Sequence, residues 1–127
     1  MSAINLRELR KINPTVGASE TDLPIAEFSA DFQSSLHFRA DLVCSSVTAA
    51  TGITVNLQTK ALGGSYADVG SANGAVAITG NGTFSITLLL ERAADQVDLP
   101  LQKSCRLVVT TGAGDAVTFD YISVQQA

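Results

Sequence analysis

Thr83-Phe84-Ser85-Ile86-Thr87-Leu88 alternates polar and apolar residues one by one. Residues 104–110 repeat this pattern less regularly, and residues 117–121 repeat it again. Successive side chains of a β-strand point to opposite faces, so such alternation predicts strands with one buried face. The last third of the chain therefore predicts a packed β scaffold.

The same alternation continues upstream. The best case is residues 36–44, where Leu36, Phe38, Ala40 and Leu42 are expected to point inward and His37, Arg39 and Asp41 outward. Further strands are expected over residues 25–28, 53–58, 66–69 and 75–79. About eight or nine short strands, spaced about ten residues apart without a long helix, are typical of an all-β sandwich or barrel. We therefore predict a single antiparallel β-sandwich, with a jelly-roll or an immunoglobulin-like strand order.

Two glycine-rich turns and two breaks in the alternation refine this prediction. Gly80-Asn81-Gly82 and residues 112–115 contain residue types that accept a positive φ, as tight hairpin turns require. Leu88-Leu89-Leu90 and Tyr121-Ile122 interrupt the period of two. At each break we expect either a β-bulge or a strand that is covered on both faces.

Residues 1–24 differ from the rest of the chain. Their apolar residues recur roughly as on one face of a short helix: Ile4, Leu6, Leu9 and Ile12. Pro14 would end that helix, which is too short to be stable without a surface to dock on. An extended arm is equally compatible. We therefore divide the chain into an N-terminal arm or short docking helix, 1–24, and a β-sandwich domain, 25–127.

The composition limits the classes of partner. Of the 127 residues, 46% are hydrophobic and only 16% are charged, whereas about a quarter is typical of soluble domains. Such a weakly charged surface suits either extensive subunit contacts or a monomer whose sheets are coated with Thr and Ser. The net charge of −4 comes without a basic stripe, so we expect no direct binding of nucleic acid. No apolar run approaches the length of a membrane span and no secretion signal begins the sequence, so we expect cytoplasmic synthesis and no membrane contact.

Cys44 and Cys105 each share an expected strand face with apolar neighbours. They could pair across the sandwich as a disulfide, or they could be buried thiols that behave as small hydrophobic residues. Cytoplasmic synthesis favours the buried thiols.

Residues with catalytic or metal-binding chemistry do not converge. His37 is the only histidine, and no Gly-x-Ser-x-Gly elbow presents a nucleophile. The acidic residues lack calcium-loop spacing, and Gly112-Ala113-Gly114 precedes an expected strand where a phosphate loop would precede a helix. We therefore expect no enzyme activity, no catalytic residue, no cofactor and no metal. A sugar-stacking platform would have to rely on Tyr66, because the chain has no Trp.

Three segments in order carry a resemblance: Leu57-Gln58-Thr59-Lys60, then Gly64-Ser65-Tyr66-Ala67-Asp68-Val69-Gly70, and then residues 105–111 with a Gly turn and Val117-Thr118-Phe119. This order resembles small β-sandwich structural proteins of tailed bacteriophages, over about residues 53–124. Many of those relatives carry Trp before the Asp-Val step, where this chain has Tyr66.

The resemblance implies a virion component of the capsid decoration or cement type. Such a protein is made in the host cytoplasm, binds the major capsid protein on the capsid exterior, often as a homotrimer, and stabilises the shell through many weak contacts. Leu6, Leu9 and Ile12 would then anchor the arm on its partner, and the turns at residues 63–65 and 112–115 would form rim contacts. The alternatives are a receptor- or glycan-binding tail or fibre module, and a head–tail or tail-tube subunit.

Overall fold

The computed structural model describes residues 5–9, 15–29, 37–60, 63–69, 74–89 and 104–126. These residues form ten strands: β1 (Asn5–Leu9), β2 (Thr15–Val16), β3 (Leu23–Ser29), β4 (His37–Thr48), β5 (Ile53–Lys60), β6 (Ala67–Asp68), β7 (Ala75–Ile78), β8 (Gly82–Leu89), β9 (Ser104–Thr111) and β10 (Ala116–Gln126). The all-β class is therefore as predicted. A strand lies within or over each of the expected stretches, although β6 is shorter than residues 66–69.

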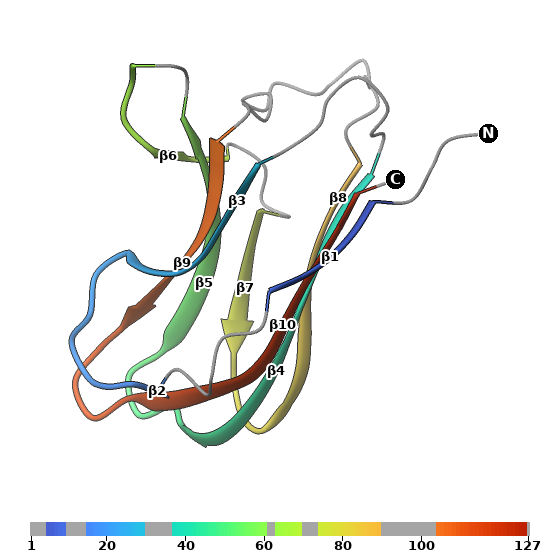
Figure 1. Ribbon diagram of the computed structural model, residues 1–127. Coiled ribbons are helices and arrows are strands. Elements are labelled where there is room, and N and C mark those ends of the chain that lie inside the picture. The colour runs from blue at the N-terminus through green and yellow to red at the C-terminus, as the bar shows by residue number, and fades with distance from the viewer. Residues whose placement is uncertain are drawn as a thin grey trace.

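The strands form two antiparallel sheets that face each other (Figure 1). Sheet 1 has the order β1-β10-β4-β8, and β2 also pairs with β10. Sheet 2 has the order β3-β9-β5-β6, and β7 also pairs with β5. Two packed antiparallel sheets make a β-sandwich, as the sequence predicts.

The strand order is that of a jelly roll, one of the two alternatives that the sequence left open. Along the chain, β2, β4, β8 and β10 belong to sheet 1, whereas β3, β5, β7 and β9 belong to sheet 2. In sheet 1 the last strand, β10, lies between the first strands and β4. This interleaving of eight main strands over two sheets is the double Greek key of jelly rolls, with β1 and β6 as additions.

The core lies between the sheets and is built from the inward residues of both. Fully buried side chains alternate along β5 at Ile53, Val55 and Leu57, as the polar and apolar pattern predicts. The largest fully buried side chains are Phe119, Leu42, Ile53, Leu57, Ile78, Ile86, Leu107 and Ile122. Burying a side chain of this size contributes about 1.5–3 kcal/mol, so this layer supplies most of the favourable free energy of folding.

The short helix expected near the N-terminus is wrong for Asn5–Leu9. These five residues are β1, which pairs antiparallel with β10 from Asn5 opposite Gln126 to Leu9 opposite Ile122. A single short helix is marginal in water, whereas the edge of β10 offers a ladder of backbone partners. The extended alternative is the one that the structure has.

The described residues between 15 and 24 include β2 of sheet 1 and the start of β3 of sheet 2. Val16 is 2% exposed and pairs with Val117 of β10, and Leu23 and Pro24 begin β3. An arm that can be separated from the sandwich therefore stays a prediction for residues 1–14.

One of the two breaks in the alternation is a bulge. The pairing of β10 with β4 shifts register between Phe119 and Tyr121, next to the break at Tyr121-Ile122. The pairing of β8 with β4 continues without a shift as far as Leu89, and Leu90 lies outside the described residues. A bulge is therefore absent from the described part of the first break.

Candidate functional site

The candidate site is the outer edge of sheet 1, along β8. Eight consecutive residues of β8 pair with β4, from Leu89 opposite His37 to Gly82 opposite Cys44, and no register shift interrupts them. Within the described residues, β8 has no second partner strand because it ends the sheet. The backbone groups on its other side can therefore pair with an added strand.

β8 also lacks the features that usually shield an edge strand. Its sequence contains neither a charged residue nor a proline. The edge strand β3 of sheet 2 instead carries Pro24, Glu27 and a register shift between Pro24 and Ala26. The edge strand β1 carries Arg7 and Glu8. Charge, proline and bulges are the devices that keep exposed edges from pairing with other chains, so β8 is the least protected of these three edges.

The outward residues of β8 belong to a face that is rich in hydroxyl groups. Thr83 and Thr87 are exposed and Ser85 is half-buried, while Ile86 between them is 1% exposed in the core. At the far side of the same face, Thr15 and Thr118 hydrogen-bond through their hydroxyl oxygens at 3.1 Å. This face therefore matches the Thr- and Ser-coated sheet that the composition predicts.

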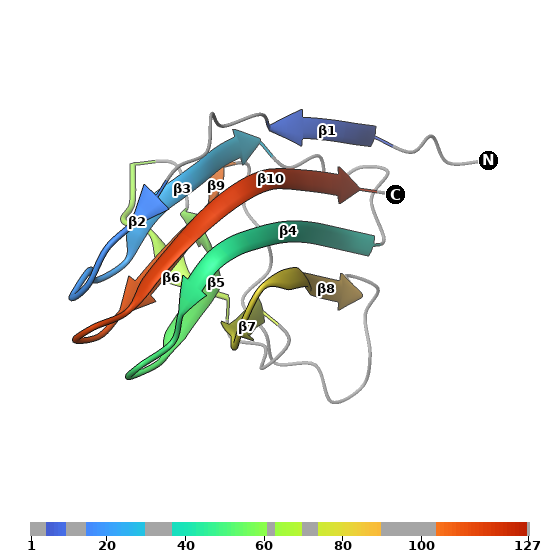
Figure 2. The ribbon, with the colours of Figure 1, turned by 90° about the horizontal axis from the view of Figure 1, so that it is seen from below.

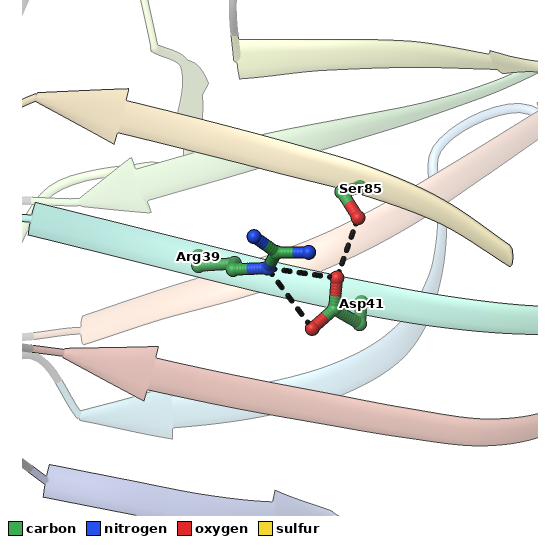
Figure 3. A network of polar contacts seen from close by, with 3 residues as sticks. All are labelled: Arg39, Asp41 and Ser85. Atoms are coloured by element: carbon green, nitrogen blue, oxygen red, sulfur yellow. Dashed lines mark hydrogen bonds and ion pairs between the residues drawn. The ribbon is translucent and has the colours of Figure 1, made fainter.

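A carboxylate ties β8 to β4 on this face (Figure 3). The Ser85 hydroxyl donates to Asp41 Oδ1, and Arg39 Nε donates to both oxygens of Asp41, at 3.0 and 3.1 Å. The side chain of Asp41 is 21% exposed and that of Arg39 is 54% exposed. Alternation along one strand puts Arg39 and Asp41 on the same face, but Ser85 joins them only through the pairing of β4 with β8.

The structure separates the residues predicted to anchor an arm. Leu6 lies opposite Gln125, in the row of Arg39, whereas Leu9 lies opposite Ile122, in the row of the buried Leu42. Leu6 and Leu9 are three residues apart on β1, and positions an odd number of residues apart on a strand belong to opposite faces of its sheet. Ile12 lies outside the described residues. The positions of Leu6 and Leu9 therefore do not share the single face that helical spacing would produce.

The two turns predicted as rim contacts differ from each other. Residues 63–65 are exposed. In the turn at residues 112–115, Ala113 and Gly114 are exposed, but Asp115 is only 2% exposed. Asp115 therefore serves the fold, and only the tip of this turn is available to a partner.

Asp115 joins two turns at one end of the sandwich. Its carboxylate accepts hydrogen bonds from the backbone N–H groups of Thr51 at 2.7 Å, Gly52 at 3.0 Å and Gly112 at 2.7 Å. The Thr51 hydroxyl donates to the carbonyl of Ala113 at 2.6 Å. Backbone donors, Thr51 foremost, hold the pKa of Asp115 below its usual value, since they stabilise the charged form.

The β2–β3 loop lies against the same end, as Figure 2 shows. The N–H of Ser19 donates to the carbonyl of Gly112 at 3.1 Å, and the N–H of Thr111 donates to the carbonyl of Glu20 at 2.8 Å. The Thr111 hydroxyl also donates to the carbonyl of Gly17 at 2.6 Å. Three connections therefore meet at this end: the β2–β3 loop, the β4–β5 turn and the β9–β10 turn. We call them, with Asp115 at their centre, the turn cluster.

Both cysteines are buried and neither forms a disulfide. Cys44 is 3% exposed and Cys105 is 0% exposed, each within the core. Burial raises the pKa of each thiol to about 11, so the reactive thiolate is scarce at neutral pH. The prediction of buried thiols that act as small hydrophobic residues is confirmed.

Among the residues that the structure describes, no group of three or more His, Cys, Asp or Glu residues could hold a metal ion. The same part of the chain contains no helix long and apolar enough to cross a membrane. His37 begins β4, and its side chain lies outside the described part of the structure.

Comparisons with known proteins bear on the fold. No protein-family model and no curated protein sequence matches the chain. Among solved structures, the chain is similar to a subunit described under "Bacillus endospore appendages form a novel family of disulfide-linked pili", with a TM-score of 0.51 and 9% identity over 100% of this chain and 90% of that one. It is also similar to the EclA C-terminal domain, a sugar-binding protein, with a TM-score of 0.43 and 10% identity over 91% and 80% of the two chains. The first likeness confirms a small β-sandwich fold and does not extend to a bacteriophage.

Proposed function

We propose that this chain is a non-enzymatic structural subunit of a virion, a decoration or cement protein that binds the major capsid protein on the outside of the capsid. In this role it associates as a homotrimer and stabilises the assembled shell through repeated weak contacts, whose strengths combine through effective concentration. The resemblance of residues 53–124 to small bacteriophage structural proteins supports the virion role. The jelly-roll order supports it by analogy of fold, since viral capsid domains are among the proteins that use it.

The unprotected edge of β8 is the observation that carries this proposal. Eight residues without charge, proline or register shift end a sheet, with exposed Thr83 and Thr87 beside the edge. An extended segment of a neighbour can add to such an edge through main-chain hydrogen bonds. A chain whose role is to contact other subunits would benefit from this edge, whereas a monomer would be exposed to aggregation by it.

β1 of a neighbouring copy has the strand direction that an antiparallel partner of β8 requires, even though Arg7 and Glu8 make β1 a better protected edge than β8. β1 and β8 are the two ends of sheet 1, and three successive antiparallel pairings make their directions opposite. If copies are placed side by side, β8 of one therefore meets β1 of the next as an antiparallel pair. Such a head-to-tail contact forms a ring where the rotation between copies closes and a filament where it does not.

A charged residue on β8 tests the edge. We expect Thr87→Lys to abolish the trimer and binding to the capsid while the melting temperature of the sandwich is unchanged, because a lysine on an edge strand opposes strand addition. Thr79→Lys is the matched control, since Thr79 is exposed and lies just before β8. Mass in solution and co-sedimentation with capsids are the measurements. If the Thr87→Lys variant forms the trimer as well as the Thr79→Lys variant does, β8 is not part of the subunit contact.

Electron microscopy of the native particle tests the role itself. We expect density for the jelly roll outside the capsid lattice, and absence of the chain from particles would overturn the proposal. The same images would show whether the N-terminal segment, with Leu6, Leu9 and Ile12, reaches a neighbouring subunit.

A head–tail or tail-tube subunit is the second candidate, and the opposite directions of β1 and β8 favour it as much as they favour the cement protein. The similar solved structure is itself a subunit of disulfide-linked pili. Mass measurement separates the two candidates: a closed trimer supports the cement protein, whereas hexamers or open fibres support the polymer.

A further inference from the structure

The outer face of sheet 2 carries a cluster of two cations and one aromatic ring. This cluster is separate from the proposed subunit contact at β8, which belongs to sheet 1. Arg106 Cζ lies 4.1 Å from the centre of the Tyr66 ring, and Lys60 Nζ lies 4.9 Å from the same point. All three side chains are half-buried. We call Lys60, Tyr66 and Arg106 the cation–tyrosine cluster.

Strand register builds this cluster. One row crosses four strands of sheet 2, with Glu27 opposite Arg106, Arg106 opposite Gln58 and Gln58 opposite Asp68. Lys60 follows Gln58 by two residues on β5 and therefore shares its face. Lys60 and Arg106 are thus diagonal neighbours on adjacent strands, within reach of each other for long side chains.

Gln58 holds the guanidinium of Arg106 in place. Arg106 Nε donates to Gln58 Oε1 at 2.8 Å, and Gln58 Nε2 donates to Asp68 Oδ1 at 2.9 Å. Gln58 is only 5% exposed, so this pair of bonds is shielded from water. A guanidinium has five N–H groups, and Nε supplies one of them, so the four on its terminal nitrogens are left for a ligand.

Neither Lys60 nor Arg106 forms an ion pair with a carboxylate among the described residues. Within that part of the chain the ion pair is Arg39 with Asp41, on the other sheet. Two like charges beside one ring repel each other, and an anion placed between them would remove that repulsion. Arg106 already covers the Tyr66 ring, so the ring is a support for cations and a poor platform for stacking a sugar.

We propose that the cation–tyrosine cluster binds the carboxylate of an Asp or Glu side chain from a partner polypeptide. The planar terminal N–H groups of an arginine fit the two oxygens of a carboxylate, and the lysine ammonium adds a point charge beside them. Tyr and Arg are also the residue types in which binding energy concentrates at protein interfaces.

The surroundings favour a single carboxylate over a polyanion. Glu27 and Asp68 are exposed and occupy the two ends of the row that contains Arg106. A nucleic acid would bring its neighbouring phosphates against these carboxylates, and the net charge of −4 would add to the repulsion. This inference does not rest on the proposed function, because the cluster lies on the sheet opposite β8.

Nuclear magnetic resonance titration tests the proposal with a defined probe. The labelled protein receives blocked glycyl-glutamyl-glycine, and blocked glycyl-glutaminyl-glycine serves as the neutral control at equal ionic strength. We expect saturable shifts of the Arg106 Nε–H, Tyr66 ring and Lys60 signals with the first peptide alone. Equal shifts with both peptides, or with sodium chloride, would overturn the proposal, as would tighter binding of a short DNA strand than of the glutamyl peptide.

Two variants locate the site. Arg106→Gln and Lys60→Gln should each weaken binding of the glutamyl peptide, Arg106→Gln by about tenfold since charged hydrogen bonds are lost. Lys60→Gln keeps the Arg106 to Gln58 bond, so it provides a readout if Arg106→Gln does not fold. Arg39→Gln is the matched control, because Arg39 is a cation on sheet 1 that is already paired with Asp41. Binding that survives both cluster variants, or that falls equally with Arg39→Gln, would contradict the assignment.

Discussion

Asp115 and Asp41 are both carboxylates that join strands of this sandwich, but their partners differ in kind. Asp115 accepts three hydrogen bonds from backbone N–H groups in two turns. Asp41 accepts from the side chains of Arg39 and Ser85 on the outer face of sheet 1. Asp115 is 2% exposed, whereas the side chain of Asp41 is 21% exposed.

The two carboxylates differ in what happens to their hydrogen-bond donors when the carboxylate is removed. Without Asp115, three backbone N–H groups of the turn cluster would lose their acceptor at a partly buried site, where an unsatisfied donor is costly. Without Asp41, both Arg39 and Ser85 could turn to water at little cost. We infer that the turn cluster determines how the loops connect the two sheets, while the network of Asp41 belongs to a surface that can change with less effect on the fold.

The strongest test of this comparison removes the carboxylate of Asp115. We expect Asp115→Ala to cause the largest loss of stability of the variants described here, because three backbone donors lose their acceptor. Asp120→Ala is the matched control, since Asp120 is an exposed carboxylate on β10, the strand that follows Asp115. Chemical denaturation is the measurement, and similar midpoints for the two variants would contradict a structural role of Asp115.

Gly112→Ala tests how closely the two turns pack. A Cβ at Gly112 would lie 2.5 Å from Cγ2 and 2.7 Å from Cβ of Thr51. The β4–β5 turn would have to move, and forcing atoms into a packed site costs about 1–3 kcal/mol. Gly80→Ala is the matched control, because nothing lies within 4 Å of its added Cβ. Equal free energies of unfolding for the two variants would show that the turn adapts freely.

Acid pH tests the charge of Asp115. Its pKa is lowered in the folded state, so its contribution to stability is fully present above the unfolded value of about 3.9. That contribution is lost as the pH falls through the folded pKa. We therefore expect the gap in unfolding free energy between the natural chain and Asp115→Asn to be constant near neutral pH and to narrow below about pH 4. A gap that stays constant down to pH 2 would mean that the charge contributes nothing.

The smallest effect is expected on the outer face of sheet 1. Asp41→Asn should lower the free energy of unfolding by about 0.5 kcal/mol, the usual scale for an exposed ion pair. Ser85→Ala provides a second measurement on the same carboxylate. A loss as large as that of Asp115→Ala would erase the distinction between the two carboxylates.

The strands were predictable because their signal is local. A period of two over residues 83–88 or 53–58 reports one buried face regardless of which strand lies alongside, and β8 and β5 lie where the sequence predicts them. The burial of Cys44 and Cys105 follows from the same signal, since each shares a face with apolar neighbours.

The N-terminal segment shows where a local signal fails. Ile4, Leu6, Leu9 and Ile12 have roughly helical spacing, yet Asn5–Leu9 is a strand whose partners are residues 122–126 of β10. Spacing over nine residues carries no information on an edge that forms at the other end of the chain. The open edge of β8 was missed for the same reason, because only the strand order makes β8 an outer strand.

By itself the sequence determined the β-sandwich class, the places of the central strands and the burial of both cysteines, because side-chain periodicity is a property of each segment alone. The tertiary structure decided the jelly-roll order, the strand at Asn5–Leu9, the turn cluster around Asp115 and the meeting of Lys60, Tyr66 and Arg106. Each of these depends on which distant segments lie side by side. The pairing of segments is set by the summed packing and hydrogen bonding of the whole chain, and no single stretch of residues contains it.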